Sequence, residues 1–282
     1  MRTCSLLMER LMANVLTTRN CTADQCDLSD GIGTDLGTQQ LTLLSALLDP
    51  TTRTVLRSLQ PKENARYLEV GAGNGSIAEM MAAGFGGSVL AVDKDVTNLV
   101  ASPGVDVVHH DVLNGVPIGP FDLIHARLVL AHLPARRRVF AQLVEQLAPG
   151  GWLVIADVGV AAELLVAPEE SDRAIWRRYT HAAYQRFRPE VDCDYGWADR
   201  AEVEMFGAGL ADVAAQHLVP LARGGGPWTS YHLNLSLQNE DGLLATGLRR
   251  EDLDRYRTML TDPEFRARFF SLTYTTGRKP TA

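Results

Sequence analysis

The sequence predicts an α/β fold built on a doubly wound, mostly parallel, seven-stranded sheet. Two observations support this prediction. Short runs rich in Val, Leu and Ile alternate with amphipathic segments of about ten residues, which is typical of parallel strands joined by helices. The first run, residues 66–70, ends in the glycine-rich turn of residues 71–75, and a helical pattern follows at once. This order puts a turn and a helix N-terminus at the carboxyl edge of the sheet, where α/β folds bind ligands.

Seven apolar runs are the expected strands. They are Arg66–Val70, Ser88–Val92, Val105–His109, Phe121–His125, Trp152–Asp157, Ala211–Pro220 and Phe269–Thr275. Parallel strands end at one edge of the sheet, so the polar residues that terminate the first five strands should lie near one another. Those residues are Glu69, Asp93, Asp111, His125 and Asp157.

Helical spacing of apolar residues predicts the remaining elements. The expected helices are Ser5–Leu16, Leu41–Leu48, Thr51–Leu59, Ser76–Ala83, Ser171–Phe187, Trp197–Gly209, Trp228–Thr246 and Arg249–Leu260. The polar segment Thr17–Gly37 should be a loop. Pro50 suits the first turn of the helix expected at Thr51–Leu59, with Asp49 as its N-cap.

We expect two units: a helical cap at residues 1–60 and an α/β domain at residues 61–282. Within the second unit, residues 160–195 are expected to form a helical lid over the strand ends. The alternatives are an ordinary helix packed on the body in place of the lid, and N-terminal helices that pack on the body or join two copies of the chain.

Composition narrows the possible functions. The net charge of −7 argues against a nucleic-acid partner, which requires a basic surface. No window is long and apolar enough for a membrane span, and acidic and basic residues interrupt the N-terminal apolar run, so we expect a cytoplasmic protein without a signal peptide. The few scattered cysteines predict reduced thiols and no metal site; they are Cys4, Cys21, Cys26 and Cys193.

Four sequence blocks point to one family. LEVGAGNGSIA, HDV, FDLIHARLVLAHLP and LAPGGWLV, between Leu41 and Asp157, resemble the class I S-adenosylmethionine-dependent methyltransferases, and within them a small-molecule, actinobacterial-type branch. The resemblance implies a Rossmann-like fold, S-adenosyl-L-methionine as cofactor and a small-molecule acceptor. An acid about 20 residues past the glycines, here Asp93, independently fits a partner for ribose hydroxyls.

The resemblance also implies a set of cofactor-binding residues. The glycines should line the methionine portion and Glu69 should hold its ammonium; Asp93 should bind the ribose. Residues 111 and 112 should meet the adenine edge, and the backbone of residues 125–127 should lie beside the sulfonium. The full set is Glu69, Gly71, Gly73, Gly75, Asp93, Lys94, Asp111, Val112, His125, Ala126 and Arg127.

Methyl transfer requires the donor and acceptor atoms to be held in line, and a base is needed only for some acceptors. The catalytic candidates are His125, beside the expected methyl group, and His181 and Tyr184, which lie off the apolar stripe of the lid helix. The latter two face the pocket if that stripe packs outward and solvent if it packs inward. His132, His232 or no base at all remain alternatives. Aromatic residues in the lid favour an apolar or aromatic metabolite as acceptor. A protein that keeps the cofactor site but catalyses a cyclisation or isomerisation is the alternative function.

Overall fold

A computed structural model describes residues 35–187 and 194–281. The helix expected at Ser5–Leu16, the four cysteines and most of the loop expected at Thr17–Gly37 lie outside the described residues. The proposed contact between copies of the chain through the first N-terminal helix therefore stays a prediction.

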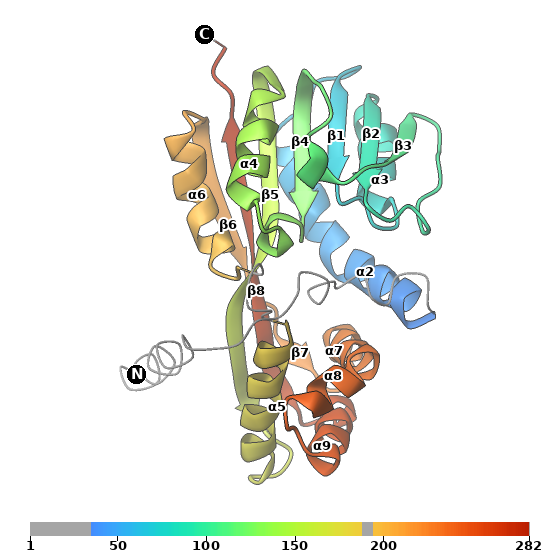
Figure 1. Ribbon diagram of the computed structural model, residues 1–282, viewed down its shortest axis with the longest axis vertical. Helices are drawn as coiled ribbons and strands as arrows, with labels where there is room; N and C mark the ends of the chain where they lie inside the picture. Colours follow the sequence, from blue (N-terminus) through green and yellow to red (C-terminus); the bar gives the residue numbers. More distant parts are fainter. Residues whose placement is uncertain (1–34, 188–193, 282) are drawn as a thin grey trace.

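One sheet runs through the described part of the chain (Figure 1). Seven strands follow the order β3-β2-β1-β4-β5-β8-β6, and a two-residue strand, β7, pairs with β8 beside this path. Neighbours among β1–β5 are parallel, whereas β8 is antiparallel to its partners, so the predicted mostly parallel sheet is confirmed. The strands are β1 Arg66–Val70, β2 Ser88–Asp93, β3 Val105–His109, β4 Phe121–Arg127, β5 Leu147–Val166, β6 Ala211–Leu218, β7 Ala222–Arg223 and β8 Arg266–Arg278.

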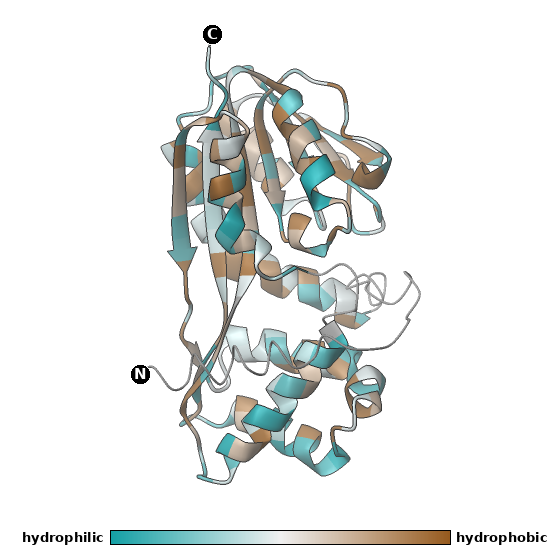
Figure 2. Cartoon of the chain, turned by 60° about the vertical axis from the view of Figure 1, so that its left-hand side comes forward, coloured by the Kyte–Doolittle hydropathy of each residue, from teal (hydrophilic) through white to brown (hydrophobic). Residues whose placement is uncertain are grey.

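Helices cover both faces of the sheet. Helices α2 (Asp35–Ser58) and α3 (Ser76–Phe85) pack on the face that Tyr67 and Leu123 share. Helices α4 (Arg136–Glu145) and α6 (Trp197–Gly207) pack on the opposite face with Leu68 and Ile124. Successive strand residues point to opposite faces, so each strand contributes to both layers and reads as a continuous apolar run. Figure 2 shows these hydrophobic residues gathered along the strands.

Strand β5 is longer than the sequence predicted. Its expected bounds were Trp152–Asp157, but it starts at Leu147 and continues to Val166, paired with β8 up to Arg266. Strand β4 ends at Arg127, beside Ala156, so β5 and β8 extend past the parallel strands as a ribbon, and β7 pairs with β8 at the far end of this ribbon (Figure 1). The prediction that residues 160–166 begin a helical lid is wrong. Their partner strand lies about a hundred residues later in the chain, and local sequence carries no sign of that pairing.

The ribbon leads into a helical lobe, which we define as α5 (Asp172–Phe187), α7 (Pro227–Gln238), α8 (Glu240–Ala245) and α9 (Arg250–Thr261). Trp176 and Tyr179 of α5 pack on Tyr256 of α9, and the two tyrosine rings stack with centroids 3.4 Å apart. The expected lid helix is therefore one part of a lobe that a second, distant segment completes. The domain boundary at residue 60 stays a prediction.

Helix α2 also departs from the prediction. It is one helix through Pro50 rather than two, and Asp35–Gly37, expected in a loop, are its first residues. Proline removes only one backbone hydrogen bond, and packing of Leu48, Val55 and Leu56 in the core compensates for that loss. Conversely, the single helix predicted at Trp228–Thr246 is divided at Asn239 into α7 and α8.

Candidate functional site

The glycine turn connects β1 to α3 at the carboxyl edge of the sheet. Gly71, Gly73 and Gly75 have φ angles of +68°, +59° and +82°, a region that side chains other than glycine rarely adopt. A Cβ atom added at Gly71 would also lie 2.3 Å from Cγ2 of Val129. Both the backbone conformation and the lack of space therefore require glycine at Gly71.

Asp93 ties this turn to the end of β2. Its Oδ2 accepts a hydrogen bond from the Gly73 amide at 2.9 Å, and its Oδ1 accepts one from the Asp95 amide at 3.0 Å. The carboxylate is partly exposed, so lone pairs remain for a ligand. The side chain of Lys94 is exposed, and its carbonyl group lies 2.8 Å from Nε2 of His109 at the end of β3.

The next pair of expected site residues follows β3. Asp111 caps a short 3-10 helix, η2 (Val112–Asn114), and accepts the Leu113 amide at 2.8 Å. Val112 is buried. The capped turn fixes a carboxylate and an apolar side chain beside each other at the same edge of the sheet as Asp93.

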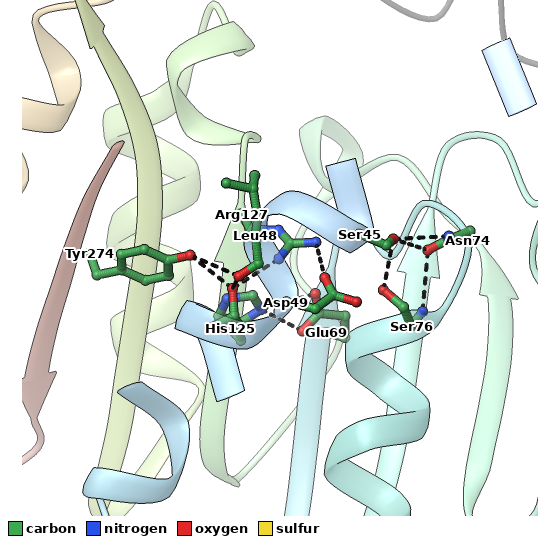
Figure 3. A network of polar contacts seen from close by, with 10 residues as sticks. Ser45, Leu48, Asp49, Glu69, Asn74, Ser76, His125, Arg127 and Tyr274 are labelled. Carbon is green, nitrogen blue, oxygen red and sulfur yellow. Dashed lines mark hydrogen bonds and ion pairs between the residues drawn. The ribbon is translucent and has the colours of Figure 1, made fainter. Parts of the chain in front are cut away.

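Glu69 and His125 form a buried pair between β1 and β4 (Figure 3). Their Cα atoms are partners in register, and Nδ1 of His125 lies 2.9 Å and 2.7 Å from the two carboxylate oxygens. The side chains are 3% and 0% exposed, respectively. An ionised carboxylate only accepts hydrogen bonds, so Nδ1 carries the proton. Nε2 of His125 is buried and has no hydrogen-bond partner among the described residues.

Helix α2 lies over the carboxyl ends of β1 and β4. Its contact residues recur on one helix face: Leu41, Ser45, Asp49 and Thr52. Leu41 Cδ2 would lie 3.5 Å from a Cβ at Gly73; Ser45 hydrogen-bonds to Asn74 at 3.1 Å and Ser76 at 3.1 Å. Asp49 and Thr52 bind the guanidinium of Arg127 at 2.9 Å and 2.8 Å. Sequence reasoning missed these four residues, although their helical spacing was visible; Asp49 was expected to be a helix cap.

The structure gathers the expected cofactor residues at one edge but places two catalytic candidates elsewhere. His181 and Tyr184 lie on α5, which packs on α8 and α9. The apolar stripe of α5 packs inward and His181 is exposed, so that residue faces solvent. His132 lies in the 3-10 helix η3 (Leu130–His132), beside the turn that follows β4.

An aromatic cluster occupies the side of the helical lobe that contacts α2. On α7, Trp228 lies edge-on to Phe270 of β8, with centroids 5.3 Å apart, and His232 stacks on Phe269 at 3.6 Å. Burial lowers the pKa of His232 to about 3, so its ring is neutral near pH 7. Asn234 of α7 donates to Gln39 of α2 at 2.8 Å, which joins this helix to the one that covers the turn.

Asp157 lies inside β5 rather than at its end, contrary to the prediction. It is fully buried, and its Oδ2 accepts the Ala131 amide of η3 at 3.2 Å. Burial raises its pKa to about 7. The carboxyl group supports the turn between β4 and η3, which includes Leu128 at a φ of +59°.

Comparison with known proteins identifies the family. A family model described as a methyltransferase domain matches residues 43–191, slightly more than half of the chain. The chain belongs to this family. It is 38% identical over 121 residues to the methyltransferase str3 of Strobilurus tenacellus, an alignment that covers 41% of this chain and 40% of the relative. It is 30% identical over 108 residues to a trans-aconitate 2-methyltransferase of Rhizobium leguminosarum, covering 36% and 42%. The chain thus spans less than half the length of these curated relatives.

Solved structures support the fold. The phosphoethanolamine N-methyltransferase 2 of Haemonchus contortus, in complex with S-adenosyl-L-methionine, matches with a TM-score of 0.55 at 16% identity, over 94% of this chain and 61% of that one. Within residues 35–187 and 194–281, no group of three or more His, Cys, Asp or Glu side chains could hold a metal ion. None of the helices described is both long and apolar enough to cross a bilayer.

Proposed function

We propose that the protein is an S-adenosylmethionine-dependent methyltransferase that acts on a small-molecule acceptor. The observation that carries this proposal is the glycine turn held by Asp93 at the carboxyl edge of the sheet, inside a methyltransferase domain. The residues present fit the cofactor. The turn cannot hold a side chain at Gly71, and the buried Nε2 of His125 has no hydrogen-bond partner within the described part of the chain. The similar Haemonchus fold in complex with S-adenosyl-L-methionine supports the choice of ligand.

The proposed roles follow the geometry of the edge. Gly71, Gly73 and Gly75 give the methionine portion access to the backbone, with Glu69 near its ammonium group. Asp93 accepts hydrogen bonds from the ribose hydroxyls and keeps the hydrogen bond that the Gly73 amide donates to it. The remaining proposed contacts are Lys94 beside the ribose, Asp111 and Val112 at the adenine, and the backbone of His125, Ala126 and Arg127 at the sulfonium.

The bound cofactor supplies an electrophilic methyl group. The protein holds the donor and acceptor atoms in line and excludes water from the site. Arg127 hydrogen-bonds to Asp49 and Thr52 and so holds α2 over this edge of the sheet. Nδ1 of His125 is committed to Glu69, so we place this residue in the cofactor site rather than assign it as base. His181 and Tyr184 stay candidates for acceptor binding on α5, which packs on α8 and α9.

We propose that the acceptor is apolar or aromatic and lies against the α7 and β8 aromatic cluster. Phe270 and Tyr274 are four residues apart on one face of β8, about 13 Å along the strand. Tyr274 hydrogen-bonds to Thr52 at 2.9 Å, next to Arg127, and Phe270 and Trp228 pack on the same apolar cluster. A molecule that reaches from the Arg127 end toward Trp228 would meet planar side chains, which suit a flat apolar body.

Titration calorimetry tests the cofactor assignment. We expect binding of S-adenosylhomocysteine and no binding of NAD; the reverse result would refute the proposal. Incubation with S-adenosylmethionine and a panel of phenols, amines and carboxylic acids should then release S-adenosylhomocysteine in proportion to methylated product. A product formed without S-adenosylhomocysteine would support the alternative, a cyclisation or isomerisation that uses the cofactor only as structure.

A further inference from the structure

The pair formed by Glu69 and His125 is more constrained than cofactor recognition alone requires. A buried carboxylate loses its hydration, and the loss is tolerated only when hydrogen bonds replace the water. Here one imidazole N–H contacts both carboxylate oxygens, from the residue in direct register on the neighbouring strand. Parallel pairing therefore fixes the two backbones, and the hydrogen bond fixes the glutamate rotamer.

We infer that His125 is the positioning residue for Glu69, and that it fixes the carboxylate to receive the ammonium group of the cofactor's methionine portion. This inference rests on the proposed function. Glu69 lies two residues after Tyr67 on β1, so its side chain is on the same face of the sheet as Tyr67, the face that α2 covers.

The nearby charges leave Glu69 available for a cation. The guanidinium of Arg127, the nearest residue of β4 on the same face, is paired with Asp49 and hydrogen-bonded to Thr52. It therefore does not compete with an ammonium group for Glu69. Two carboxylate oxygens offer about four lone-pair positions, and one imidazole N–H leaves the others for the ligand.

The second ring nitrogen of His125, Nε2, points away from Glu69, so the ring contacts the carboxylate through Nδ1 alone. Nε2 is buried without a hydrogen-bond partner among the described residues. A buried polar atom without a hydrogen bond is costly, and sites that wait for a ligand are where such atoms persist.

Matched ligands separate this role from general support of the pocket. S-adenosylhomocysteine carries the ammonium group, whereas 5′-methylthioadenosine has the same adenosine and sulfur but no amino-acid portion. We expect His125→Phe to weaken binding of S-adenosylhomocysteine about tenfold or more, since hydrogen bonds to charged groups have about this effect. Binding of 5′-methylthioadenosine should stay within about twofold. His125→Asn, which keeps an N–H near the Nδ1 position, should recover part of the loss and serves if the phenylalanine variant does not fold.

A double-mutant cycle with Glu69→Gln tests whether His125 acts through Glu69. In the Glu69→Gln protein, adding His125→Phe should change the dissociation constant of S-adenosylhomocysteine less than about twofold. Additive losses, an unchanged constant in His125→Phe, or equal losses for both ligands would each overturn the inference. If the wild-type protein binds neither ligand, the proposed function fails and the inference with it. Wild-type binding with an additive cycle refutes the inference alone.

Discussion

The guanidinium of Arg127, the last residue of β4, binds the carboxylate of Asp49 in the middle of α2, with Nη2 and Oδ1 2.9 Å apart. Nη1 of the same group donates to Thr52 at 2.8 Å, and Thr52 in turn contacts Tyr274 of β8. One side chain thus joins the covering helix to the strand whose end lies beside the proposed methyl group. Both members of the ion pair are largely buried, at 11% and 18% exposure, so the contact is poorly screened by water.

We predict that Asp49→Ala lowers the free energy of unfolding by about 1–3 kcal/mol, because it leaves the Arg127 guanidinium largely buried without its charged partner. Urea unfolding measures the loss. Glu163→Ala breaks the exposed Glu163–Arg268 pair and should cost about 0–1 kcal/mol. Equal losses of unfolding free energy for the two variants would mean that the buried pair stabilises the fold no more than an exposed pair does. Weaker binding of S-adenosylhomocysteine should accompany the first change only.

Asp93→Ala should affect both ligand binding and folding. The proposed ribose contacts disappear, which should raise the dissociation constant of S-adenosylhomocysteine about ten- to a hundredfold. The amides of Gly73 and Asp95 also lose their acceptor, so the free energy of unfolding should fall by about 1–2 kcal/mol. Calorimetry and urea unfolding measure the two effects. Asp106→Ala, on the exposed side of β3, should change neither value; an unaltered dissociation constant for Asp93→Ala would refute the ribose contact.

His232 should make the protein less stable in acid. Burial lowers its pKa to about 3 from 6.5, so the unfolded chain takes up a proton below about pH 6.5 that the folded protein does not. Its contribution to stability is therefore present above pH 6.5 and is lost as the pH falls toward 3. Urea midpoints at pH 4.5 and 7.5 should differ less in His232→Phe than in the wild type. An NMR signal of this ring that shifts between pH 5 and 8 would contradict the prediction.

Asp157 should have the opposite effect. Burial raises its pKa from 3.8 to about 7, so the folded protein keeps a proton that the unfolded chain has released. Stability from this group is complete below about pH 3.8 and is lost as the pH rises through 7. Asp157→Asn is neutral at every pH and should gain stability relative to the wild type between pH 5 and pH 8. A difference in unfolding free energy that does not change with pH would show that the carboxyl group is ionised when folded.

The sequence determined the positions of most strands and the glycine turn with its neighbouring acid, because these depend on local patterns. Apolar runs, a glycine turn and an acid at the end of the second strand lie within single elements or adjacent ones. Strands Arg66–Val70 and Val105–His109 have the predicted bounds. Elements that follow one another in the sequence usually pack side by side, so few arrangements are possible for them. Periodicity and turn chemistry are then enough to predict these elements.

Only the tertiary structure decided how distant segments complete the site. The pairing of β5 with β8 over a separation of about a hundred residues placed residues 160–166, the first part of the expected lid, in a ribbon and brought α5 against α9. Asp49, expected to cap a second helix, lies inside the continuous helix α2 and forms an ion pair with Arg127. His125 was placed at a strand end by sequence, but its hydrogen bond to Glu69 exists only because β1 and β4, far apart along the chain, are neighbours in register. Such contacts depend on which surfaces meet after folding, and the local sequence does not contain that information.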